Sequence, residues 1–162
     1  MTYVCLLRGV NVGGNKMVKM EELRRKFESL GFTNVRTLLQ SGNVIFDAKT
    51  KPEDLAALLG IPVVLRTQAE IRKVIAANPF PEEAENDPAR LLVVFLSAAL
   101  PSDEPLRKVA LPSEKFVAKG KEIYIYFAQG AGRSKLAESL TEKKLGVIPT
   151  ARNWNTVNKL VL

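Results

Sequence analysis

The chain contains no histidine and only one cysteine, Cys5, among its 162 residues. Histidine is the side chain that most often exchanges protons at neutral pH, and it is the commonest metal ligand in proteins. Its absence excludes Ser-His and Cys-His catalytic pairs and most zinc chemistry. Cys5 has no partner for a disulfide, which indicates a reducing compartment, and its place in an apolar run predicts a small buried side chain. We expect neither a metal nor another cofactor.

Long apolar runs are absent as well. No run of about eighteen apolar residues occurs, and the first residues lack the charged region and cleavage site of a signal peptide. These features predict a cytoplasmic protein without a membrane partner, and they say nothing about its oligomeric state. With 46% apolar and 25% charged residues, the chain has the composition of a globular protein that buries a core.

The net charge of +7 is distributed unevenly along the chain. Residues 1–40 carry 7 basic and 3 acidic side chains, residues 41–104 carry 6 and 10, and residues 105–162 carry 11 and 4. The two ends are therefore basic and the middle is acidic. If the ends meet in the fold, they form a positive surface that attracts phosphates, nucleic acid or an acidic protein. The alternative is a solvated basic face without a partner.

The first half of the chain has apolar patterns in the order β-α-β-β-α-β. The expected strands lie at residues 3–8, 35–39, 44–46 and 62–66, and the expected helices carry the apolar stripes of Leu23 with Phe27 and of Leu55, Leu58 and Leu59. The two middle strands flank a turn at 40–43, which predicts a hairpin. This order is that of ferredoxin-like units, so we expect a small α+β sandwich.

Two segments have the spacing of a capping box, in which a hydroxyl and a carboxylate three residues apart close a helix start. Thr50 with Glu53 predicts the start of the second helix, and Thr67 with Glu70 predicts the start of a third. After this third helix, residues 79–89 are rich in acidic side chains and flanked by prolines, and we expect a linker there. The predicted domains are therefore an N-terminal ferredoxin-like unit at 1–80 and a C-terminal α+β unit at 90–162.

The second half repeats the order β-α-β-β. A strand is expected at 91–96, a helix at 102–111, and a hairpin from two strands at 115–118 and 122–127. One further helix is expected to carry Leu136, Leu140 and Leu145, followed by a last short helix or strand. The sequence thus predicts an α+β protein of two ferredoxin-like units with a possible internal duplication.

Four segments combine glycine, amide or hydroxyl groups with cations or an aromatic ring. The first two comprise Arg8, Asn11, Gly13, Gly14 and Lys16, and Gln40, Ser41 and Asn43. In the segment from Arg8 to Lys16, backbone amides and cations predict an anion-binding nest, and the alternative is a tight structural turn. Its spacing matches neither a P-loop nor a Rossmann fingerprint. The second presents an amide and a hydroxyl to a ligand, although a plain hairpin turn is favoured.

The other two segments lie near the C-terminus. They comprise Gly132, Arg133, Ser134 and Lys135, and Arg152, Asn153, Trp154 and Asn155. In the former, glycines and cations precede a helix start, where unpaired amides attract anions, and the alternative role of its serine is a helix cap. In the latter, the tryptophan stacks on a ligand ring or, as is more common, anchors a core or an interface. We hypothesise that Arg8, Arg133 and Arg152 share one surface.

These segments together resemble a known family. The stretches LLRGVNVGGNKMVKMEELR, LGFTNVRTLLQSGNVIFD, ANPF, EIYIYFAQGAGRSKL and KKLGVIPTARNWNTVNKL, in this order, are similar to the bacterial family called domain of unknown function 1697. The resemblance spans nearly the whole chain. It implies an α+β fold built from ferredoxin-like units, and it supplies no activity, substrate or catalytic residue.

The basic ends and the two loops that join glycine to cations favour a binding module for an anionic ligand, such as a nucleotide or RNA. One alternative is a small enzyme that acts on a phosphorylated or nucleotide-like substrate and holds its charge with arginine and lysine. Another is a protein-interaction domain with an acidic partner. No pairing of a nucleophile with a base is visible, so the sequence does not decide whether the protein is an enzyme.

Overall fold

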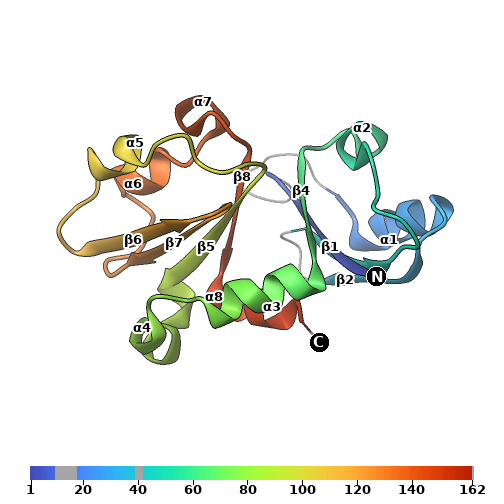
Figure 1. The fold of residues 1–162 in the computed structure, drawn as a ribbon, viewed down its shortest axis with the longest axis horizontal. Coiled ribbons are helices and arrows are strands. Elements are labelled where there is room, and N and C mark those ends of the chain that lie inside the picture. The colour runs from blue at the N-terminus through green and yellow to red at the C-terminus, as the bar shows by residue number, and fades with distance from the viewer. Residues whose placement is uncertain (10–17, 39–41, 162) are drawn as a thin grey trace. The chain divides into compact units, whose positions relative to one another are not determined.

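The computed structural model describes residues 1–9, 18–38 and 42–161. The chain forms two compact units, the first from Met1–Arg72 with Leu160–Leu162 and the second from Lys73–Lys159 (Figure 1). Each unit contains one four-stranded sheet and helices, so the α+β class predicted from the sequence is confirmed. We describe each unit by itself.

Among the described residues, the first unit contains four strands and two complete helices, and the boundary with the second unit falls inside a third helix. Its elements are β1 (Thr2–Leu7), α1 (Met20–Ser29), β2 (Thr33–Leu38), β3 (Asn43–Asp47), α2 (Leu55–Leu59), β4 (Val63–Thr67) and α3 (Gln68–Ala76). All four strands pair antiparallel in the order β2-β3-β1-β4. The predicted order of elements, β-α-β-β-α-β, is found in this unit.

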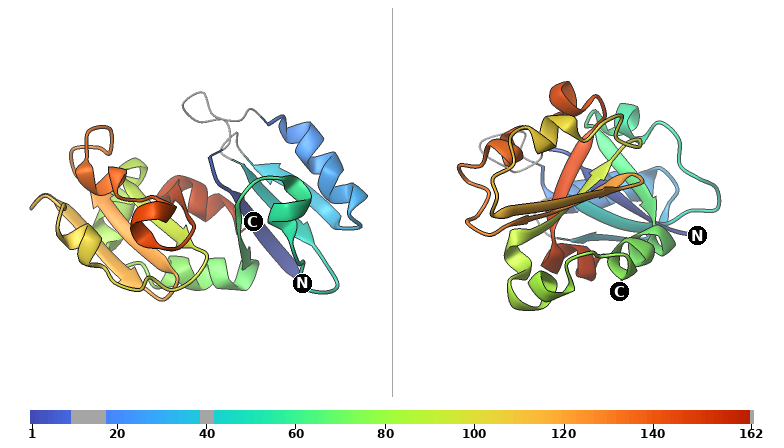
Figure 2. Two further views of the ribbon diagram at one scale, coloured as in Figure 1. Left: turned by 90° about the horizontal axis from the view of Figure 1, so that it is seen from above. Right: turned by 60° about the vertical axis from the view of Figure 1, so that its left-hand side comes forward.

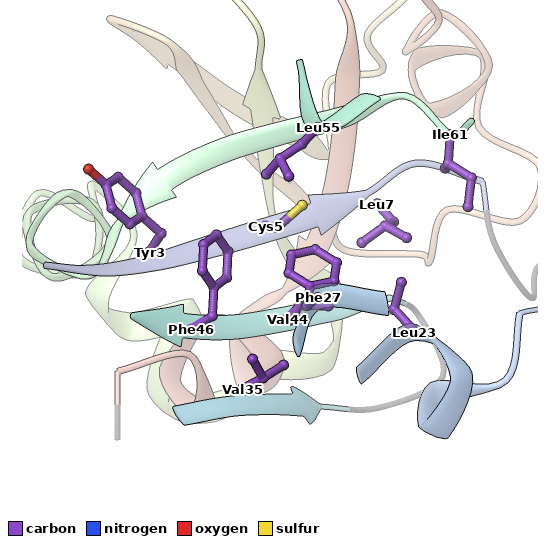
Figure 3. Close-up of a cluster of buried hydrophobic side chains, with 10 residues drawn as sticks. All are labelled: Tyr3, Cys5, Leu7, Leu23, Phe27, Val35, Val44, Phe46, Leu55 and Ile61. Carbon is purple, nitrogen blue, oxygen red and sulfur yellow. The ribbon is translucent and has the colours of Figure 1, made fainter. Parts of the chain in front are cut away.

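The core of the first unit lies between one face of this sheet and helices α1 and α2 (Figure 3). Alternate residues of β1 supply Tyr3, Cys5 and Leu7 to it, because side chains in a strand point to opposite faces in turn. From α1 come Leu23 and Phe27, which are four residues apart and therefore lie on one face of the helix. The periodicity that predicted these two core residues is confirmed.

The second unit repeats this plan with shorter helices. Its elements after α3 are α4 (Pro81–Asn86), η1 (Pro88–Arg90), β5 (Leu91–Leu96), α5 (Glu104–Arg107), β6 (Glu114–Lys119), β7 (Glu122–Phe127), α6 (Lys135–Glu138), α7 (Glu142–Leu145), β8 (Pro149–Asn153) and α8 (Trp154–Lys159). Its sheet is antiparallel in the order β6-β7-β5-β8, which is the order of the first sheet in local numbering. The two sheets therefore share one topology.

One face of the second sheet packs against α5, α6 and α7, which Figure 2 shows from two directions. Val94 and Leu96 of β5 face Leu106 of α5, Leu136 of α6 and Leu145 of α7. The sequence predicted a single helix through the last two of these leucines. The structure instead has two four-residue helices, each begun by its own hydroxyl cap: Ser134 for α6 and Thr141 for α7.

One predicted helix start differs in the structure. Thr50 and Glu53 do not form a capping box, because α2 begins only at Leu55, after Asp54 in the left-handed conformation. The other capping box is present. The amide of Glu70 donates to Thr67 Oγ1 at 3.1 Å, and the amide of Thr67 donates to Glu70 Oε1 at 2.9 Å.

The acidic segment at 79–89, predicted as a linker, folds into α4 and η1. It is held to the second sheet by two contacts: Lys115 Nζ lies 3.0 Å from Glu83 Oε2, and the Tyr126 hydroxyl donates to Asp87 Oδ2 at 2.8 Å. The lysine lowers the pKa of Glu83, and the carboxylate of Asp87 raises the pKa of Tyr126. The two units of the structure are divided inside α3, whereas the sequence analysis placed the boundary in this acidic segment.

Across the ranges given above, no helix has the length and apolar character needed to cross a membrane.

Candidate functional site

The loop between β7 and α6 contains one of the four segments singled out in the sequence. It begins with a turn in which the amide of Gly130 donates to the carbonyl of Phe127 at 2.9 Å. Gly130 has a φ of +80°, a conformation that glycine adopts without steric cost. The loop ends at Ser134, whose amide donates to the carbonyl of Ala131 at 3.2 Å. These bonds fix both ends of the loop.

Glu114, the first residue of β6, ties this loop to the neighbouring segment. Its Oε2 accepts a hydrogen bond from the Ser134 hydroxyl at 2.5 Å, and its Oε1 accepts one from the amide of Leu111 at 2.8 Å. The hydroxyl of Ser134 in turn accepts from the amide of Ala137 at 3.2 Å, which makes Ser134 the N-cap of α6. This cap is the alternative to a ligand role that the sequence leaves open for Ser134.

A hollow of about 310 Å³ opens above these groups. It is lined by Leu111, Ser113, Glu114, Gln129, Gly130, Gly132, Arg133 and Ser134. Arg133 and Lys135 are exposed, and within the described chain neither forms an ion pair. The hollow therefore offers a ligand one carboxylate, one apolar side chain, and an arginine whose charge is not neutralised.

The segment from Arg152 to Asn155 has a structural role in the second unit. Arg152 is only 6% exposed, and its Nη1 donates to Thr150 Oγ1 at 2.7 Å and to the carbonyl of Ala151 at 2.8 Å. Asn153 caps α8 by accepting from the amide of Thr156 at 3.0 Å. Trp154 is buried at 8% exposure, as expected for the alternative in which it anchors a core. Only Asn155 is exposed.

Two of the three arginines expected on one surface are placed differently in the second unit: Arg133 is exposed on the loop before α6, and Arg152 is buried in β8. Ala151 of β8 packs against the core cluster that contains Leu136 of α6, so its side chain points to the face of the second sheet that the helices cover. The loop with Arg133 leads into α6 on this face. Arg152 follows Ala151 in β8 and therefore points to the opposite face. The hypothesis of one shared surface is thus wrong for this pair. The alternation of side chains along β8, which turns Arg152 away from the helices, is the physical reason.

The first unit contains the remaining candidates. Arg8 is partly buried directly after β1, and its amide donates to the carbonyl of Pro62 at 3.0 Å. Asn43 is fully buried in β3, where its Nδ2 donates to the carbonyl of Leu38 at 2.7 Å and so closes the hairpin. The contact of Asn43 agrees with a structural role. The candidates outside the described residues are Asn11, Gly13, Gly14, Lys16, Gln40 and Ser41.

Groups suited to metal binding or nucleophilic catalysis do not gather in the described ranges. No cluster of three or more cysteine, aspartate or glutamate side chains capable of holding a metal occurs there, and the sole cysteine is buried. Sequence reasoning missed Glu114. Its contact with a serine twenty residues further on depends on the pairing of β6 with β7, in which Glu114 lies opposite Phe127. No local motif indicates that contact.

A comparison with protein families matches residues 1–124 to the model described as "Protein of unknown function (DUF1697)". The chain belongs to the DUF1697 family. The matched part of this DUF1697 chain includes Glu114 and ends within β7, so the loop with Arg133 lies beyond it. The resemblance inferred from the sequence is therefore confirmed.

A solved structure with a similar fold is that of the conserved bacterial protein SP0830 from Streptococcus pneumoniae. The likeness has a TM-score of 0.73 at 23% sequence identity and covers 99% of the DUF1697 chain and 96% of the other chain. At this identity it supports the fold alone. The comparison with curated proteins gives no match.

Proposed function

We propose that this DUF1697 protein is a cytoplasmic binding module for an anionic ligand, a nucleotide or RNA, and that the loop between β7 and α6 contacts the anionic group. The observation that carries the proposal is the position of Arg133. It lines a hollow of about 310 Å³, it is exposed, and no described carboxylate neutralises it. A guanidinium donates two parallel hydrogen bonds to a phosphate, which makes arginine suited to this contact.

The loop is held in place before a ligand arrives. The turn at Gly130, the cap at Ser134 and the carboxylate of Glu114 fix its backbone, so little conformational entropy is lost when an anion binds. Glu114 lies in the same hollow and disfavours a purely anionic occupant. A nucleotide fits this combination because its phosphate suits Arg133 while its base or sugar carries donors that suit a carboxylate.

The overall charge favours the same ligand class. The protein carries a net charge of +7, and 11 of its 24 basic residues lie after residue 104. A positive field attracts anions over a distance set by the salt concentration, which is about 10 Å at 0.1 M. We therefore expect binding to weaken as salt is raised.

The test is a titration of the whole protein with adenosine monophosphate and with single-stranded RNA of mixed sequence, at low and high salt. Replacing Arg133 with alanine is expected to weaken binding by about 1.5–3 kcal/mol, or roughly ten- to a hundred-fold, which is the scale of a charge-assisted hydrogen bond. Lys143→Ala is the matched control, since it removes an exposed charge in α7 that does not line the hollow.

Three outcomes are informative. Unchanged binding in Arg133→Ala would refute the assignment of the loop. If neither adenosine monophosphate nor RNA binds the unchanged protein, the binding function is refuted. Turnover of the nucleotide by the unchanged protein would instead favour the alternative of a small enzyme. Circular dichroism of the variant checks that it remains folded.

A further inference from the structure

The two units are equivalent not only in strand order but also in backbone hydrogen bonds. At the end of β1 the amide of Leu7 donates to the carbonyl of Gly42, and at the end of β5 the amide of Leu96 donates to the carbonyl of Lys121, each at 2.9 Å. Arg66 and Arg152 then occupy matching positions, since they pair with Val4 and Val93 of the central strands. Both arginines are buried, at 3% and 6% exposure.

The first unit contains a hollow at the position that corresponds to the one beside Arg133. It is about 450 Å³ in volume and is lined by Met1, Leu30, Gly31, Phe32, Thr33, Asp47, Ala48, Lys49 and Thr50. In both units the lining comes from the segment that enters the edge strand, β2 or β6, and from the loop that leaves the strand paired with it, β3 or β7. The two hollows share their position in the topology, although their residues differ.

The chemistry of the two hollows is also parallel. Each contains one carboxylate that accepts two hydrogen bonds: Glu114 in the second unit, and Asp47 in the first, which accepts from Thr2 Oγ1 at 2.6 Å and from Asn34 Nδ2 at 2.7 Å. Each also contains an exposed cation on the loop, Arg133 or Lys49, and the first hollow is lined in addition by Met1, whose exposed ammonium group donates to the carbonyl of Ala48 at 3.1 Å. Within the described residues Lys49 forms no ion pair.

In the described part of the chain, no aromatic residue lines the hollow of the second unit, and one lines the hollow of the first unit. Phe32 lines it and is held by two other rings, with centroid distances of 4.6 Å to Phe46 and 6.0 Å to Phe27. A ring that is fixed in this way offers a ligand a flat apolar surface at small entropic cost. Lys49 and Thr50 line the same hollow, and an ammonium and a hydroxyl group are donors that suit a phosphate.

From this equivalence we infer that the first unit contains a second binding site for a nucleoside phosphate, with the base on Phe32 and the phosphate at Lys49, so that one chain binds two ligands. The inference rests on the proposed function, because the ligand class is carried over from the hollow of Arg133. It goes beyond that function by assigning a second site, formed by the first unit alone.

The experiment measures the stoichiometry of adenosine monophosphate binding to the whole chain by isothermal titration calorimetry at low salt. The unchanged protein is expected to bind two equivalents, Lys49→Gln and Arg133→Gln to bind one each, and the double variant to bind none. Lys51→Gln is the control, because Lys51 lies on the same connection before α2 and does not line the hollow. We expect it to keep both sites.

The outcomes separate this inference from the function on which it rests. One equivalent in the unchanged protein, lost in Arg133→Gln and kept in Lys49→Gln, would overturn the second site while leaving the proposed function intact. Failure of both this nucleotide and RNA to bind the unchanged protein would overturn both. Two equivalents that persist in Lys49→Gln and disappear together in Arg133→Gln would overturn the assignment to the first unit.

Discussion

Phe27 provides a sharp test of the first core. It is fully buried, and its ring lies beside that of Phe46 (Figure 3). The centroid distances are 5.2 Å to the ring of Phe46 and 6.0 Å to that of Phe32. These contacts join α1 to β3 and to the residue that precedes β2. Replacing Phe27 with alanine removes the ring from all of them at once, without introducing a polar group or a charge.

The expected loss follows from the environment of the ring. Full burial of a side chain of this kind contributes about 1.5–3 kcal/mol, and each aromatic pair adds about 0.5–1.5 kcal/mol beyond burial. Because two pairs are lost and the cavity closes only in part, we expect the free energy of unfolding to fall by about 3–5 kcal/mol.

Urea denaturation, followed by tryptophan fluorescence and by circular dichroism, measures this loss. Circular dichroism is needed because Trp154 belongs to the second unit, so fluorescence alone reports on the wrong sheet. Lys26→Ala, at an exposed site in the last turn of the same helix, is the control and should change stability by less than about 0.5 kcal/mol. A comparably small change in Phe27→Ala would refute the packing described for α1.

Two further predictions concern single contacts in the first unit. Hydrogen bonds from Thr2 and Asn34 lower the pKa of Asp47, so its contribution to stability is present at neutral pH and is lost as the pH falls through the lowered pKa. Asp47→Asn should therefore be less stable than the unchanged protein near pH 7, and the difference in urea midpoints should shrink towards about pH 2; a constant difference would contradict this. Thr67→Ala removes the hydroxyl that caps α3 and should cost about 1 kcal/mol by the same assay, whereas Thr67→Ser, which retains the hydroxyl, should cost clearly less.

The sequence predicts those parts of the fold that depend on local patterns. The strand at 91–96 and the hairpin around Gly120 are found where expected, since an apolar run and a glycine turn determine them without help from distant residues. The core positions Leu23 and Phe27 follow from helical spacing alone. In each case the signal and the structure lie within about ten residues of each other.

The predictions that differ from the structure required knowledge of distant contacts. The acidic segment at 79–89 resembles a linker in composition, yet Lys115 and Tyr126 bind its carboxylates from a sheet formed thirty or more residues later. Likewise, one helix is expected from the sequence to carry Leu136 and Leu145, whereas two short helices supply them to the core. Propensity is a weak guide when tertiary packing decides such cases.

The candidate site could be predicted only where its residues have a local signal. The serine before α6 has a local cap signal, and Ser134 is found as that cap. Glu114 has no local signal, because only the β6–β7 register brings it to Ser134. Arg152 is expected at a surface because it stands beside amides at the end of a predicted apolar element, whereas its burial on one face of an edge strand shows only after the strands are paired.

The return of the chain to the first unit has a consequence for synthesis on the ribosome. Leu160 belongs to that unit, and its carbonyl accepts a hydrogen bond from Gln68 Nε2 at 3.1 Å. Translation therefore delivers this acceptor only after all of the second unit has been made. Until then the side-chain amide of Gln68 lacks the partner that it has in the complete chain. The part of the protein that emerges first is thus completed last.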